Sequence, residues 1–134
     1  MSLKDAERET LVNLYIKKSD EALDDARLTY NQARWKASAN RLYYALFHAI
    51  TALFVCDGIP AHSHNGMKVK FGKNYVLTNL ATEDEGKLLS QMETMRERAD
   101  YDATFMASES VLSERFERVE QMIQHIKELI FRGR

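Results

Sequence analysis

Glycine and proline are scarce in this chain of 134 residues, which has five glycines and one proline. The first 57 residues contain neither. Because all-β sandwiches and barrels need many turns, this scarcity argues against them and favours long helices. The proline and three of the glycines lie between Gly58 and Gly72, so the main interruption of the chain is predicted there.

Cysteine and surplus charge are also scarce. The single cysteine, Cys56, excludes an intramolecular disulfide and a zinc site made of cysteines alone. Lysine and arginine number 19 against 20 acidic residues, so any nucleic-acid binding must come from a local patch. The longest uncharged apolar segment, residues 42–56, is short for a membrane span, and no apolar signal-peptide core opens the chain. We therefore expect a cytoplasmic protein with no membrane partner.

Apolar residues recur at helical spacing in four segments. We expect long helices over residues 4–32 and 36–57, from 82 or 83 to 101, and from 108 or 110 to 131. The second is apolar nearly all round and is predicted to be the most buried. Thr82 with Glu85 matches a capping box. The predicted fold is all-α: an antiparallel up-and-down four-helix bundle, with a short extra helix or ordered loop in the central connection, in a single domain over residues 1–134.

Three polar side chains interrupt the apolar second helix. Arg41, Tyr44 and His48 are spaced i, i+3 and i+7, which places them on one face. One interpretation is a polar cleft, in which His48 is a general acid or base and Arg41 holds a phosphate. The alternative is a core histidine beside a helix-end arginine.

The central connection is basic. Residues 59–82 contain no Asp or Glu. The segment has two aromatic residues, Phe71 and Tyr75, interspersed among basic and imidazole side chains, which are His62, His64, Lys68, Lys70 and Lys73. Such a segment can bind phosphates and stack bases. The alternative is that the two rings close the end of the bundle while the lysines are solvated. A histidine pair alone is a weak metal pattern, so we predict no metal.

The third helix ends in a second charged cluster. Arg98 and Tyr101 share a face and could meet the second-helix residues across a cleft, while Arg96 and Asp100 are four apart and can pair. Arginines here would also complement the helix dipole. The phosphate loops, nucleophile elbows and zinc motifs of common enzymes are missing.

Together these segments resemble a known family. Residues 38–49, SANRLYYALFHA, look like the R-x-Y-Y-A-x-F-H-A segment of HEPN-domain proteins (higher eukaryotes and prokaryotes nucleotide-binding domain). His64-x-Gly66, followed by Phe71 and Tyr75, resembles the family's H-x-G loop, and residues 98–101, RADY, resemble its R-x-A-D-Y motif. The match spans roughly residues 10 to 130. Within the family, the chain resembles the small stand-alone prokaryotic branch.

The resemblance implies a helical bundle, commonly a homodimer, that often acts beside a minimal nucleotidyltransferase in a toxin–antitoxin-like pair. Some members are metal-independent endoribonucleases with an Arg-x(4–6)-His motif on a late helix. Here the late helix has Arg96 and Arg98 without a following histidine, and the formal match is Arg41 to His48 on an earlier helix.

Three hypotheses follow. The first is a toxin or accessory subunit that binds a nucleotidyltransferase partner and nucleotide or RNA phosphates, without a cofactor. The second is a metal-independent endoribonuclease, with His48 and Arg98 as catalytic residues. The third is a structural interaction module. The residues expected to bind nucleotide or RNA are Arg41, Tyr44, His64, Lys68, Lys70, Lys73, Asp100 and Tyr101.

Overall fold

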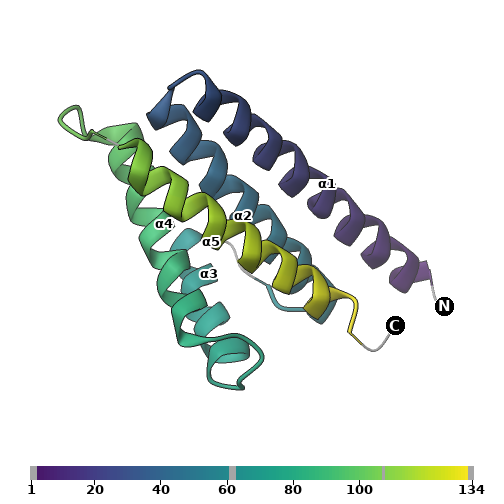
Figure 1. Ribbon diagram of the computed structural model, residues 1–134. Coiled ribbons are helices and arrows are strands. Elements are labelled where there is room, and N and C mark those ends of the chain that lie inside the picture. Colours follow the sequence, from purple (N-terminus) through teal and green to yellow (C-terminus); the bar gives the residue numbers. More distant parts are fainter. Residues whose placement is uncertain (1–2, 61–62, 107, 133–134) are drawn as a thin grey trace.

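The computed structural model describes residues 3–60, 63–106 and 108–132, and within those ranges the regular structure is helical (Figure 1). In chain order the elements are α1 (Leu3–Asn31), α2 (Trp35–Asp57), α3 (His64–Phe71), the π-helix η1 (Gly72–Val76), α4 (Glu83–Tyr101) and α5 (Glu109–Ile130). The predicted all-α bundle of four long helices, with a short extra helix in the central connection, is confirmed. No helix in the described part of the chain is long and apolar enough to cross a membrane.

Helices α1 and α2 form a long antiparallel hairpin (Figure 1). Two fully buried serines join their backbones: the hydroxyl of Ser19 donates to the carbonyl of Ala45 at 2.7 Å, and that of Ser38 donates to the carbonyl of Ala26 at 2.9 Å. The small side chains at these positions let the helices approach closely, and the hydroxyls satisfy their own hydrogen-bonding needs on the neighbouring helix.

Helix α2 is the centre of the molecule, as its composition predicted. It packs against α1 on one side and against α4 and α5 on the other (Figure 1). The fully buried leucines Leu42, Leu46 and Leu53 lie along it. Several polar side chains of α2, among them Ser38, Tyr43 and His48, lie against neighbouring elements.

Much of the central connection between α2 and α4 is helical. Helix α2 ends at Gly58, which adopts the left-handed conformation with φ of 71° that glycine accepts without strain. Helix α3 then starts at Ser63, whose hydroxyl accepts from the amide of Gly66, and η1 continues it. The rings of Phe71 and Tyr75 are each 1% exposed, so they close the bundle and do not offer a face for stacking bases.

The last two helices begin at the predicted caps. The Thr82 hydroxyl accepts from the amide of Glu85, and the Glu85 carboxylate accepts from the amide of Thr82, which confirms the capping box. Ser108 caps α5 through the amide of Val111. Helix α4 runs back along α2, so that the carboxyl-terminal end of α4 lies near the start of α2 (Figure 1).

Candidate functional site

A groove with a volume of about 670 Å³ lies where α2, α3 and α4 meet. We call it the Arg96 groove, and its lining residues are Tyr44, His64, Arg96, Glu97, Arg98, Tyr101 and Asp102. The groove thus brings together one predicted site residue from α2, one from α3 and two from α4. Each of the three sequence segments that resemble family motifs therefore contributes to this groove.

Arg96 is the buried cation of this groove and was not among the predicted site residues. It is 7% exposed, and its guanidinium lies over the rings of Tyr43 at 5.5 Å and Tyr44 at 6.0 Å. Its position on the apolar stripe of α4, four residues after Met92 and three before Ala99, is the sequence signal that could have found it. A charged residue on a buried stripe needs a compensating partner.

The partners of Arg96 are acidic but distant. Its Nη1 lies 3.6 Å from Asp100 Oδ2, the pair that the spacing predicted, and its Nη2 lies 4.0 Å from Glu97 Oε1. Among the described residues, its Nε is buried without a hydrogen-bond partner. A guanidinium has five N–H donors, so Arg96 keeps donor capacity beyond these contacts.

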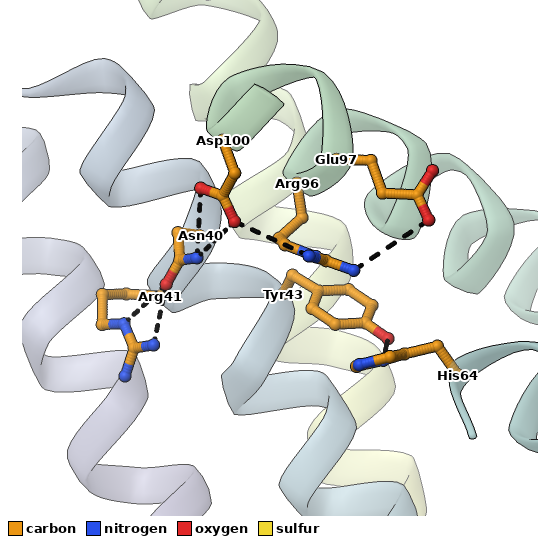
Figure 2. A network of polar contacts seen from close by, with 7 residues as sticks. All are labelled: Asn40, Arg41, Tyr43, His64, Arg96, Glu97 and Asp100. Atoms are coloured by element: carbon orange, nitrogen blue, oxygen red, sulfur yellow. Dashed lines mark hydrogen bonds and ion pairs between the residues drawn. The ribbon is translucent and has the colours of Figure 1, made fainter. Parts of the chain in front are cut away.

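A chain of polar contacts leads from Arg96 to Arg41 (Figure 2). Asn40 donates from Nδ2 to both oxygens of Asp100, at 3.0 and 3.3 Å, and its Oδ1 accepts from Arg41 at 2.7 and 2.9 Å. Its amide must have this orientation, because a flipped amide would set its oxygen against a carboxylate. Arg41 and Asp100 line a neighbouring pocket of about 460 Å³, together with Asn40.

His64 enters the groove from the start of α3 and is held by a tyrosine. Its Nδ1 lies 2.6 Å from the hydroxyl of Tyr43 (Figure 2). Its ring also contacts the ring of Phe47, with 4.9 Å between centroids. Burial raises the pKa of Tyr43 well above its usual range, and the negative charge of Glu93 raises it further, so the phenol keeps its proton.

Arg98 stands at the rim of the groove. Its Nε lies 3.8 Å from Asp102 Oδ2, and its guanidinium lies 4.8 Å from the centroid of Phe105. It also lines a second, more apolar groove of about 510 Å³ between α4 and α5, together with Met106 and Arg115. Tyr101, beside it, is 80% exposed, so an aromatic face is offered to solvent next to two arginines.

The row Arg41, Tyr44 and His48 exists as the spacing predicted. Arg41 lies over the Tyr44 ring at 5.1 Å, and the rings of Tyr44 and His48 are 6.1 Å apart. His48, however, stacks on Tyr15 of α1 and is not part of the groove lining. Burial, followed by the charges of Lys18 and Arg41, lowers the pKa of His48. The structure therefore does not bring His48 and Arg98 together in one cleft.

The three lysines of the central connection lie outside the groove lining. Lys68 Nζ forms an ion pair at 3.2 Å with Glu93, which is largely buried, and Lys70 donates to the carbonyl of Pro60. Lys73 is exposed on η1. The first two lysines have protein partners, and none of the three lines the groove with Arg96 and Arg98.

His62 lies outside the described residues. Within the described ranges, no group of three or more His, Cys, Asp or Glu side chains is placed to hold a metal ion. The cations that the groove offers to an anion are therefore its arginines.

Comparison with known proteins agrees with the motifs. The model of the HEPN domain family matches residues 12–130. A UPF0332 protein of Thermotoga maritima is 28% identical over 124 residues, which cover 92% of this chain and 94% of the relative.

Two proteins of Methanocaldococcus jannaschii carry the name "Putative toxin". One is 25% identical over 122 residues, which cover 89% of this chain and 91% of that protein. The other is 28% identical over 89 residues, which cover 66% of this chain and 60% of that protein.

Proposed function

Because this chain belongs to the HEPN domain family, we propose that it is the toxin or accessory subunit of a nucleotidyltransferase-linked toxin–antitoxin-like system, and that its Arg96 groove binds the phosphates of a nucleotide or RNA. Two relatives with toxin names support the first half. The observation that carries the second is the meeting of Arg96, Arg98 and His64 in one groove.

The charges of the groove suit a reversible anion site. Arg96 and Arg98 lie 3.6 to 4.0 Å from their acidic partners, longer than a good hydrogen bond. Glu97, Asp100 and Asp102 are the acids that partly neutralise the two arginines. A phosphate at hydrogen-bonding distance replaces these long ion pairs with shorter, charge-assisted hydrogen bonds.

The exposed ring of Tyr101 favours a nucleic-acid ligand over a bare phosphate. Bases stack on exposed aromatic side chains in single-stranded nucleic-acid sites, with cations beside them for the backbone. Tyr101 is 80% exposed and lines the same groove as Arg98. Single-stranded RNA is therefore the ligand to test first.

The test is fluorescence anisotropy with a short labelled single-stranded RNA. We expect Arg98→Ala to weaken binding about tenfold, because a hydrogen bond to a charged group contributes about 1.5–3 kcal/mol. Arg8→Ala removes the same charge from α1, where Arg8 lies away from the groove lining, and is the matched control. Equal affinities for the wild type and both variants, or no binding at all, would contradict the proposal.

RNA cleavage without a metal is the second candidate function, supported by a histidine beside two arginines. An arginine would stabilise the charge on a phosphorane, and a histidine would transfer the proton. The assay is cleavage of RNA in EDTA by the wild type, His48→Ala, His64→Ala and Arg98→Ala. Loss of cleavage in His48→Ala alone would support the assignment made from sequence, whereas loss in His64→Ala would place the chemistry in the groove.

Protein partners are a further part of the proposal. Leu11 and Leu14 of α1 are 44% and 46% exposed, one helical turn apart, and Leu28 is 58% exposed. Exposed leucines on one helix side support a contact with a second copy or with a nucleotidyltransferase. Analytical ultracentrifugation of the protein alone tests for the second copy, and the same measurement with a minimal nucleotidyltransferase added tests for that partner. A monomer that binds no nucleotidyltransferase would count against both contacts.

A further inference from the structure

The hydroxyl of Tyr43 is a buried group that forms a hydrogen bond with His64. Tyr43 is 1% exposed, so water does not solvate its hydroxyl. Among the described residues, its hydrogen-bond partner is Nδ1 of His64, at 2.6 Å. A buried O–H without an acceptor carries a desolvation penalty, so the proton of the phenol belongs on this contact.

The direction of that hydrogen bond fixes the imidazole. If Tyr43 donates, then Nδ1 of His64 is the acceptor, and the proton of the neutral ring is on Nε2. The opposite arrangement, with Nδ1–H donating to the phenol oxygen, would leave the buried O–H without an acceptor. The raised pKa of Tyr43 agrees with this direction, since the phenol does not ionise to become a pure acceptor.

We propose that Tyr43 is a positioning residue that holds neutral His64 in its Nε2–H form, so that His64 meets a phosphate oxygen as a hydrogen-bond donor. The identity of the ligand rests on the proposed function, whereas the state of the imidazole does not. His64 lines the groove with Arg96 and Arg98, so the ligand class is an anion rich in acceptor oxygens, which a phosphodiester provides.

The surroundings of His64 suit a donor of this kind. The rings of Phe47 and Tyr44 contact it from α2, at 4.9 and 6.2 Å between centroids. The charged groups of α4 and its end that share the groove are Arg96, Glu97, Arg98 and Asp102. Glu93, whose charge acts on Tyr43, is itself paired with Lys68.

A consequence concerns cleavage. A neutral imidazole with its proton on Nε2 donates at that nitrogen and cannot take a proton there. In this form His64 binds a phosphate oxygen as a hydrogen-bond donor, and it does not deprotonate a ribose hydroxyl. Loss of its remaining proton would leave an imidazolate, so neutral His64 is not a general acid either. Tyr43 therefore makes neutral His64 a phosphate-binding donor and not the base of a cleavage reaction.

The first test reads the tautomer directly. Nitrogen-15 NMR of the histidine rings, with His64→Gln used to assign the signals, is recorded at about pH 8.5, above the ordinary imidazole range. We expect the full Nε2–H pattern for His64 in the wild type. A substantial Nδ1–H population would overturn the proposal, whether or not RNA binds.

The second test is a double-mutant cycle on RNA affinity. The amide nitrogen of Gln reaches about as far as imidazole Nε2, so His64→Gln keeps a donor without needing Tyr43. Tyr43→Phe removes only the hydroxyl and keeps the ring on which Arg96 lies. We expect Tyr43→Phe to weaken binding about three- to tenfold in the wild type and to have no effect in the His64→Gln background.

The outcomes separate the two proposals. An equal loss from Tyr43→Phe in both backgrounds would show a structural role and overturn the positioning role, and so would no loss in either. If the wild type binds neither RNA nor a mononucleotide, the proposed function fails, while the NMR pattern still decides the state of His64. If Tyr43→Phe does not fold, the wild-type spectrum alone decides.

Discussion

Two histidines on neighbouring elements have opposite environments. His48 stacks between α1 and α2, and among the described residues its Nδ1 is buried without a hydrogen-bond partner. His64 has a hydrogen bond to Tyr43 and lines the Arg96 groove. The same side chain is therefore a packing group in one place and a groove-lining group in the other.

The environment of His48 predicts a pH-dependent stability. Because burial lowers its pKa, the unfolded chain binds a proton at His48 more readily than the folded protein does. The folded state therefore loses stability as the pH falls through the ordinary imidazole value of about 6.5. We expect the free energy of unfolding of the wild type to decrease relative to that of His48→Gln between about pH 7.5 and pH 5.5.

Urea denaturation of both proteins across this range measures the difference. The comparison with His48→Gln cancels the titration of the other histidines, which both proteins share. A difference in free energy that stays constant with pH would show that His48 is solvated and protonates freely in the folded state.

Single-residue geometry was predictable from sequence only within one helix. The row of Arg41, Tyr44 and His48 follows from α-helical periodicity, and its ring and cation contacts are present. Which histidine meets Arg98 depends instead on how α3 is placed against α4, and local spacing carries no information on that. Arg96 was missed because an arginine near a helix end has an ordinary explanation in the helix dipole.

At the scale of elements, the start of α4 is a junction of three hydrogen bonds. The Glu85 carboxylate accepts from the amide of Thr82 through one oxygen, and its other oxygen lies 2.7 Å from His125 Nδ1 of α5. The Thr82 hydroxyl completes the capping box. The cap therefore also joins α4 to α5.

We expect Thr82→Ala to lower the free energy of unfolding by about 1 kcal/mol, the usual loss when an N-cap hydroxyl is removed. Thr10→Ala is the matched control, because the Thr10 hydroxyl donates at 3.0 Å to the carbonyl of Ala6 inside α1 and does not cap a helix. The measurement is chemical denaturation followed by circular dichroism. Equal effects of the two substitutions would mean that the cap contributes nothing beyond threonine's own propensity.

The elements themselves were largely predictable, and the central connection was predictable only in part. Caps, breakers and apolar stripes placed the four long helices to within a residue or two of their bounds. The π-helix that follows α3 has no local signal. Its wide turn accompanies a long-range contact: the Tyr75 hydroxyl donates to Asp57 at 2.6 Å, and Arg132 donates to the same carboxylate at 2.9 Å.

For the whole molecule, the balance of charge decides how RNA can bind. The formal net charge is −1, so the protein as a whole does not attract a polyanion. The proposed site is a groove with two arginines, two acids and a histidine. Affinity must then come from a few local contacts.

This balance predicts a shallow salt dependence. Each phosphate neutralised on a single strand contributes about −0.7 to the slope of log K against log salt concentration, so two arginines give about −1.4. We expect this slope for short single-stranded RNA, measured by anisotropy at several salt concentrations, and about −0.7 for Arg98→Ala. A slope steeper than about −4 would require several more phosphate contacts. Those contacts would lie outside the groove, on exposed cations such as Lys73, and the binding surface would then be the basic central connection that the sequence suggested.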